Sequence, residues 1–398
     1  MDVNLNKLNI DKVTWTLVKF GDVVKEPKEN IKDIHAEGIE HVVGLEHIDS
    51  EDIHLRRSAN LESGTTFTKK FRTGDVLFGR RRAYLKKAAQ APFSGICSGD
   101  ITVFRAKDYI LADLLPFVVC NDKFFDYAVK HSAGGLSPRV KFKDLANYEF
   151  LLPPKDQQKQ LAELLWAMDD VIEREKELLY LLKTSFQIIS FKSFSLLQDK
   201  GKRNEIALQE LQNLITEPIC NGIFRTKENF GDEVPLINVT DIYASFMVIP
   251  KTLQRIPVSK KELESFSANS GDVIFNRSSL VKEGVGHTCL VPEVEEKMVF
   301  ECHLMRVRPN KKLIDPRFLC RYCLSPFGRN YLISRSQTTT MTTLNQNSLN
   351  KMRIPLPTLD EQKKIADSLE EIENIATKVK TEIFASQSLQ KSLINLIF

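Results

Sequence analysis

The sequence predicts a mixed α/β (α+β) protein with an internal pseudo-two-fold duplication, in which two similar globular portions are each followed by one long helix. The 398 residues exceed one ordinary hydrophobic core. Landmark segments recur in the same order in both halves, and two long stretches carry a heptad pattern. We expect globular portions at residues 1–153 and 201–356, and helices at residues 154–200 and 357–398.

The duplication is visible in two pairs of segments. Residues 152–163 and 356–367 share six of twelve positions, where chance would give roughly one. Residues 74–80 and 271–277 share five of seven positions around a Gly-Asp-Val core. The order is the same in both halves, so each half is predicted to contain one globular portion and one helix.

Both predicted helices follow a Leu-Pro landmark and begin with a helix-start signal. Thr358-x-x-Glu361 is a capping box, in which each side chain satisfies a free backbone amide of the first turn. In the first copy, Pro153-Pro154 ends the preceding strand and Asp156 is the expected cap.

Apolar residues recur every seven positions in both helical stretches, over more repeats than a surface helix shows. Two matched seams in one chain most simply pack as an antiparallel coiled coil, with each helix roughly 60 Å long. The alternative is that each helix only covers its own globular portion. The residues expected in the seam are Leu161, Leu164, Met168, Val171, Leu178, Leu182, Ile365, Leu369, Ile372, Val379 and Ile383.

The globular portions combine strands and helices. Short apolar runs predict strands at residues 101–104 and 304–307. Helices are predicted at residues 111–130, with an interruption at Pro116, and at residues 316–334. Because strands and helices do not alternate regularly, a doubly wound sheet is not expected.

A basic cluster in the first half is a candidate for DNA binding, although a net charge of +4 is too mild to indicate it. The stretch from Lys69 to Lys87 contains eight basic residues and one acid, Asp75. The run 80–82 has no nearby acid to balance it, and the planar fork of arginine suits guanine edges or phosphates. The alternative is a solvated charged surface.

A polar loop precedes each Leu-Pro landmark, at residues 131–139 and 335–347. Hydroxyls, amides and glycine backbone suit phosphate and base-edge contacts, although a flexible connecting loop explains them equally well. The residues expected to contact DNA are Lys69, Lys70, Arg72, Arg80, Arg81, Arg82, Tyr84, Lys86, Lys87, Ser137, Arg139, Lys141, Arg277, Ser278, Ser279, Lys282, Thr342, Thr343 and Asn345.

The sequence contains no recognisable catalytic or cofactor site. Neither G-x-x-x-x-G-K-[ST] nor G-x-G-x-x-G after a strand is present. Cys320-x-x-Cys323 with Cys302 and His303 is a weak zinc candidate, because a second spaced pair is missing. We expect buried structural thiols instead, and no catalytic residue, metal or cofactor in this chain.

The sequence also indicates the compartment. No stretch approaches eighteen apolar residues, and the segment Met1 to Lys12 lacks the apolar core of a secretory signal. Seven scattered cysteines suit a reducing environment. We therefore expect a cytoplasmic protein without a membrane partner.

This organisation resembles the specificity subunit of type I restriction-modification systems. The resemblance rests on Leu-Pro-x-x-Asp-[Gln/Glu]-Gln-Lys at residues 152–159 and 356–363, on the helices that follow, and on Gly-Asp-Val-[Leu/Ile]-Phe-x-Arg at residues 74–80 and 271–277. Residues 93–101 are also similar to the family. The resemblance covers essentially the whole chain, and the order and duplication of the motifs are more specific than any one motif.

The resemblance implies that each globular portion is a target recognition domain that reads one half of a split, asymmetric sequence in double-stranded DNA. It implies that the helices form an antiparallel coiled coil that sets the gap and holds two methyltransferase subunits, which use S-adenosylmethionine. Restriction subunits with ATP/Mg-dependent translocation would complete the complex. The chain departs from a strict repeat at Lys155/Leu359 and at residues 79–81 against 276–278, so individual base contacts do not transfer.

Three alternatives remain open at this point. The chain could serve a type II system with a separate specificity subunit. It could also be a coiled-coil scaffold without DNA affinity, or a nuclease or methyltransferase in its own right.

Overall fold

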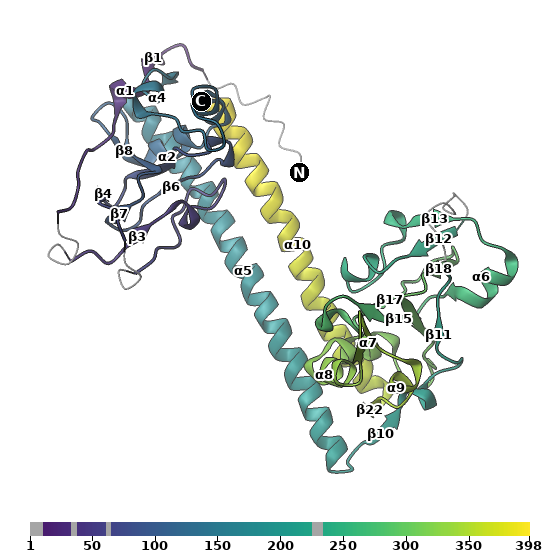
Figure 1. The fold of residues 1–398 in the computed structure, drawn as a ribbon. Helices are drawn as coiled ribbons and strands as arrows, with labels where there is room; N and C mark the ends of the chain where they lie inside the picture. Colours follow the sequence, from purple (N-terminus) through teal and green to yellow (C-terminus); the bar gives the residue numbers. More distant parts are fainter. Residues whose placement is uncertain (1–10, 33–37, 61–64, 225–233) are drawn as a thin grey trace. The chain divides into compact units, whose positions relative to one another are not determined.

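The computed structural model describes residues 11–32, 38–60, 65–224 and 234–398 (Figure 1). The chain divides into a first unit, Met1–Glu177 with Lys380–Phe398, and a second unit, Leu178–Val379. Within the described residues, no helix is long and apolar enough to cross a lipid bilayer.

Two long helices, α5 (Lys155–Lys202) and α10 (Leu359–Ile397), confirm the helical prediction (Figure 1). α5 has 48 residues and α10 has 39. The predicted capping box is present, since the Glu361 amide donates to Thr358 Oγ1 at 3.3 Å and the Thr358 amide donates to Glu361 Oε2 at 3.1 Å. The prediction that Asp156 caps α5 is wrong, because the helix already begins at Lys155 and Asp156 lies within its first turn.

A buried glutamine in each landmark explains why the motif precedes a helix. Gln158 Nε2 donates to the Pro153 and Tyr109 carbonyls at 2.9 and 3.0 Å, and its Oε1 accepts from the Leu111 amide at 2.9 Å. Gln362 does the same in the second copy, with the Pro357 carbonyl and the amide of Asp315 among its partners. Each glutamine thus ties the start of its long helix to the globular portion before it.

Among its described residues, the first unit contains three small sheets and short helices. Its sheets are β2 (Val24–Lys25)–β8 (Ile101–Ala106)–β5 (Val76–Gly79)–β6 (Ala88–Gln90), β3 (Val42–Val43)–β7 (Gly95–Cys97)–β4 (Lys69–Phe71) and β1 (Thr16–Lys19)–β9 (Glu149–Leu152). Its short helices are α1 (Phe20–Val23), α2 (Leu115–Val119), α3 (Asp122–Lys130) and α4 (Phe142–Leu145).

The second unit repeats this plan. Its sheets are β11 (Cys220–Asn221)–β19 (Leu304–Val307)–β15 (Val273–Asn276)–β17 (Thr288–Leu290), β13 (Gln254–Ile256)–β12 (Val234–Ile237)–β18 (Met298–Phe300)–β14 (Ser267–Ala268), β16 (Ser278–Ser279)–β21 (Thr342–Thr343)–β20 (Gln337–Thr338) and β10 (Ala207–Glu210)–β22 (Arg353–Leu356). Its short helices are α6 (Lys260–Phe266), α7 (Pro316–Leu324), α8 (Pro326–Ser334) and α9 (Gln346–Asn350).

The strand order confirms the duplication. The order β2–β8–β5–β6 corresponds to β11–β19–β15–β17, and both units have one parallel pair, β3 with β7 and β12 with β18. The strands predicted at residues 101–104 and 304–307 are β8 and β19. The interruption predicted at Pro116 is wrong, because a proline fits the first turn of α2; the break comes at Asn121, whose side chain caps α3.

Each unit buries the end of a long helix in its hydrophobic core. In the first unit, Leu393 and Ile397 at the end of α10, and Phe398 after it, enter a core that also contains Phe124. In the second unit, Phe194 near the end of α5 packs on Phe318 with ring centroids 5.6 Å apart. The helices are therefore part of the globular cores and not only connections between them.

The face of α5 that the first unit buries differs from the expected seam. Leu165 and Ile172 are buried, whereas Leu164 and Val171 are 47% and 48% exposed. Within this unit the helices are antiparallel. Gln390 of α10 donates to the Leu165 carbonyl of α5, and Ser386, which comes earlier in α10, donates to Glu175, which comes later in α5. Of the other expected seam residues, Leu178 is exposed, Leu161, Met168, Leu182, Ile365 and Ile372 are partly buried, and Leu369, Val379 and Ile383 are buried.

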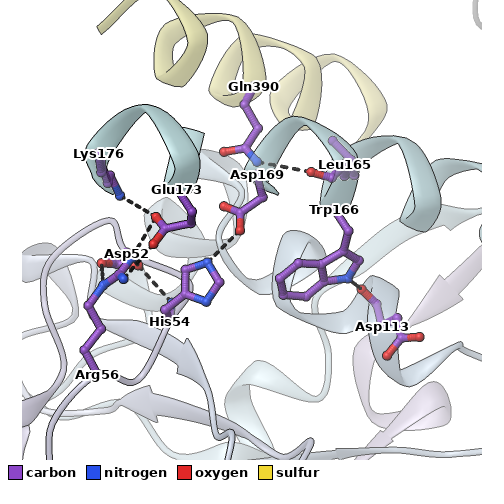
Figure 2. Close-up of polar contacts among 10 residues, drawn as sticks. All are labelled: Asp52, His54, Arg56, Asp113, Leu165, Trp166, Asp169, Glu173, Lys176 and Gln390. Carbon is purple, nitrogen blue, oxygen red and sulfur yellow. Dashed lines mark hydrogen bonds and ion pairs between the residues drawn. The ribbon is translucent and has the colours of Figure 1, made fainter. Parts of the chain in front are cut away.

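A polar cluster attaches the first globular portion to α5 (Figure 2). His54 Nε2 lies 2.6 Å from Oδ2 of the buried Asp169, and Arg56 pairs with Glu173 at 2.7 Å and with Asp52 at 2.7 Å. The hydrogen bond with Asp169 raises the pKa of His54 despite its partial burial. Although burial acts to raise it, hydrogen bonds from Arg56 and a nearby lysine hold the pKa of Glu173 at about 2.

This attachment predicts a pH-dependent stability. The pKa of His54 is raised by folding, so its contribution is complete below the unfolded pKa and is lost as pH rises through the folded value. Thermal unfolding of the full chain should therefore show a melting temperature that falls as pH rises above about 6.5, the usual pKa of histidine. His54→Gln should flatten this dependence, and equal pH slopes for both proteins would contradict the assignment.

Candidate nucleic-acid interface

A small polar sheet in the second unit carries the residues that the sequence singles out there. β16 pairs with β21 (Ser278 with Thr343), and β21 pairs with β20. The hydroxyls of Thr338 and Thr342 lie 3.0 Å apart, and the Leu344 amide donates to the carbonyl that precedes β16. The segment that begins at Arg277 and the polar loop, predicted separately, are therefore one structure.

The first unit has a counterpart of this sheet, which consists of isolated β-bridges. Arg81 pairs with Arg139, and Arg139 pairs with Ala133. The Arg82 amide donates to the Pro138 carbonyl at 2.8 Å, so the arginine run and the polar loop lie side by side here as well. We call the polar sheet of the second unit, and its counterpart in the first unit, the ribbons.

Asp100 organises the ribbon of the first unit, and sequence reasoning missed it. Arg81 Nη1 lies 3.2 Å from Asp100 Oδ2, and Arg139 Nε lies 2.7 Å from Oδ1. Arg81 Nη2 also donates to Ser137 Oγ at 3.0 Å. Burial acts to raise the pKa of Asp100, but the two arginines outweigh it and lower that pKa overall. The expectation that no acid balances the arginine run is therefore wrong, because Asp100 is distant only along the chain.

The tips of the ribbons expose apolar side chains beside the polar ones. In the first unit, Tyr84 in the turn after the arginines is exposed, and Leu136 in the loop is 97% exposed. In the second unit, Leu280 and Val281 after β16 are 83% and 61% exposed. Arg82 adopts a left-handed backbone with φ of 55°, which turns the chain sharply at this point. Each ribbon therefore presents a mixed polar and apolar edge.

The remaining basic residues of the first cluster lie apart from the ribbon. Lys69 in β4 bonds to Glu26 at 3.2 Å, and Arg72 pairs with Glu29 at 3.1 Å. Lys86 pairs with Asp122 at 2.6 Å, next to the end of α10. Lys70 also lies in β4, and Lys87 donates to the carbonyl of Leu45. The eight basic residues are thus divided between the ribbon, the region of β4, the end of α10 and the carbonyl of Leu45, and they are not one surface.

The acid of the Gly-Asp-Val motif has a structural role. Arg105 on β8 donates to both oxygens of the buried Asp75, each at 2.7 Å. Arg308, just after β19, does the same with the buried Asp272, at 2.9 and 2.8 Å. The preceding glycine has φ of 86° in both copies, a backbone that favours glycine. The motif therefore fixes the strand that leads into each ribbon.

Three further predicted residues lie at the edges of the ribbons. Lys141 precedes α4 and Lys282 begins a short turn after β16, and both are exposed. The Asn345 side chain accepts from the Ser348 amide at 2.7 Å and caps α9. The Asn345 side chain therefore has a structural role as a helix cap, whereas the two lysines face solvent.

The cysteines do not assemble as the weak zinc candidate required. Cys320 and Cys323 are buried in α7, as expected for structural thiols, and burial raises the pKa of Cys320 to about 12. Cys302 and His303 lie elsewhere, where their ligand atoms and those of Glu301 are within 4.8 Å of one another. Three consecutive side chains at a turn, of which only His303 is exposed, do not establish a metal site.

Comparison with known proteins identifies the family. The model of the type I restriction modification DNA specificity domain matches the chain twice, over residues 12–184 and 204–385. The chain belongs to the type I restriction-modification DNA specificity family. Both matches include a ribbon and most of a long helix, so the family pattern repeats with the fold.

Individual relatives agree with this assignment. A putative type I restriction enzyme MjaX specificity subunit from Methanocaldococcus jannaschii is 25% identical over 48% of this chain and 45% of its own length, so the match spans about half of that relative. The MjaVIII specificity subunit of the same organism is 22% identical over 76% of this chain and 73% of its own. The S subunit of a type I restriction-modification system from M. genitalium, known from a crystal structure, shares the fold, with a TM-score of 0.59, 13% identity and 98% coverage of both chains.

Proposed function

We propose that this chain is the non-catalytic specificity subunit of a type I restriction-modification complex and reads a bipartite, asymmetric target in double-stranded DNA. The observation that carries the proposal is the ribbon, which recurs at corresponding places in both units with different side chains. A duplicated scaffold with different side chains at its exposed edge suits two different half-sites.

The long helices support a fixed gap between the half-sites. At 1.5 Å per residue, α5 would be roughly 72 Å long and α10 roughly 58 Å. Both are continuous and both end in hydrophobic cores. Rigid helices anchored at their ends can set the distance between two readers, and this distance would correspond to the unspecified gap of the target.

The exposed apolar row of α5 supports docking of partner proteins. Leu164, Val171 and Leu178 recur every seven residues, and each is nearly half exposed. Exposed apolar rows of this kind are typical of protein interfaces. We assign this row to two methyltransferase subunits, which would supply S-adenosylmethionine chemistry, while restriction subunits would supply ATP/Mg-dependent translocation.

The experiment that tests the function is to co-express the chain with the neighbouring methyltransferase and map modified adenines across the genome. Two short motifs separated by a fixed gap, one modified on each strand, are expected. A single contiguous motif would contradict the bipartite mechanism. Methylation that is unchanged when the chain is omitted would favour a scaffold without DNA affinity.

The first ribbon predicts a specific change in DNA affinity. Arg80→Ala/Arg81→Ala/Arg82→Ala should weaken binding, and the dependence of log K on log salt should become shallower by about 1 for each lost phosphate contact. The matched control is Lys69→Ala/Lys70→Ala/Arg72→Ala, which removes the same charge from β4 and from the residue that follows it. Salt titrations of the methyltransferase-bound chain measure both. If both variants lose the same affinity for DNA, the basic residues act only through their general charge, and the ribbon makes no contact of its own.

The helices predict a change of the gap alone. Removing seven residues from each helix at the boundary between the units, 178–184 and 374–380, would shorten each by roughly 10 Å, or about three base pairs, and would keep Glu373. The mapped motif should keep both half-sites and lose about three base pairs of gap. Deletion of seven residues from one helix only is the control, and it should abolish methylation. If the paired deletion leaves the gap unchanged, the helices do not set the distance between the half-sites.

A further inference from the structure

Three positions of the two ribbons match one another, but their chemistry differs. The first unit carries charged residues there, and the second unit carries hydroxyls and an imidazole. The matched sets are Arg81, Asp100 and Arg139 in the first unit, and Ser278, His303 and Thr343 in the second.

Backbone pairing establishes two of these matches. Arg81 bridges to Arg139 in the first ribbon, and Ser278 pairs with Thr343 in the second. Arg139 also bridges to Ala133 in the polar loop, as Thr343 pairs with Gln337 of β20. The same backbone positions therefore hold arginine in one ribbon and serine or threonine in the other.

A backbone hydrogen bond establishes the third match. The Arg80 amide donates to the Asp100 carbonyl at 3.0 Å, and the Arg277 amide donates to the His303 carbonyl at 2.8 Å. Both acceptors come directly before the strand that pairs with the Gly-Asp-Val strand. Asp100 and His303 thus occupy one place, and the carboxylate that holds two arginines has no acidic equivalent at that place in the second ribbon.

Asp100 holds Arg139 in an orientation that leaves the outer edge of its guanidinium, formed by the two Nη atoms, available. The contact uses Arg139 Nε, and among the residues that the structure describes no group bonds to its two Nη atoms. The side chain is 44% exposed. Two parallel Nη donors match the O6 and N7 acceptors of guanine, and a guanidinium already fixed by a carboxylate loses less entropy on binding. Arg81 differs, because its Nη atoms already bond to Asp100 and Ser137.

We propose that Arg139, held by Asp100, reads a guanine in the half-site of the first unit, and that Thr343 makes the second unit read the corresponding base pair without an arginine–guanine contact. Threonine offers one hydroxyl and one methyl group, which suit a thymine methyl or a single base-edge acceptor. This inference rests on the proposed function and adds the base that distinguishes the two half-sites.

The test selects preferred duplexes from a randomised pool with the full chain bound to its methyltransferase subunits. Arg139→Thr should lower discrimination at one G·C pair of one half-site by roughly 5- to 150-fold and leave the other half-site unchanged. Asp100→Asn retains the charge of Arg139 and should relax the same position by a smaller factor. The reciprocal variant His303→Asp/Thr343→Arg should gain guanine preference in the other half-site.

The outcomes separate the possible roles of Arg139. Uniform weakening across all sequences, with a shallower salt slope, would make Arg139 a phosphate contact and overturn the proposal. An unchanged motif in Arg139→Thr, with wild-type melting temperature, would overturn it as well. If the wild-type chain selects no bipartite motif, the proposed function itself fails, and that result is distinct from a bipartite motif that Arg139→Thr leaves intact.

Discussion

The structure depends on the burial of the helix ends in the globular cores. The last residues of α10, including Ile397, and Phe398 after it complete the core of the first unit, and Phe194 of α5 enters the core of the second. A helix end that is fully packed cannot rotate or fray without exposing apolar surface, which costs about 25 cal/mol per Å². This constraint makes each long helix an anchored element of a unit.

The duplication keeps the same positions for attachment but changes the partners. Asp169 on α5 and Glu373 on α10 occupy corresponding places in the two repeats. Asp169 holds His54 (Figure 2), whereas Glu373 holds the buried Arg321, whose guanidinium also lies 3.4 Å from the centre of the Phe246 ring. The two long helices therefore carry an acid at corresponding places. In the first repeat its partner is a histidine, which titrates, and in the second its partner is an arginine, which stays charged.

Much of the candidate interface could be predicted as residue types, but not as an arrangement. Arg80 to Arg82 and the polar loop were each identifiable from their composition, and the structure joins them in one ribbon. Asp100 gave no local signal, because it is an isolated acid that reaches Arg139 only through the pairing of distant strands. The heptad rows were identified correctly as apolar, but periodicity could not decide between Leu164 and its neighbour Leu165, since both lie on one broad stripe.

The sequence by itself determined the duplication, the two long helices and the family, because repeats, heptads and caps are local patterns that survive without tertiary contacts. Tertiary structure alone decided which charges are already paired. Lys69 and Arg72 bond to glutamates of their own unit, whereas Arg139 keeps its outer edge available. The reason is physical: a charge is satisfied by whatever lies within a few ångströms of it, and that neighbour is set by strand pairing and not by distance along the chain.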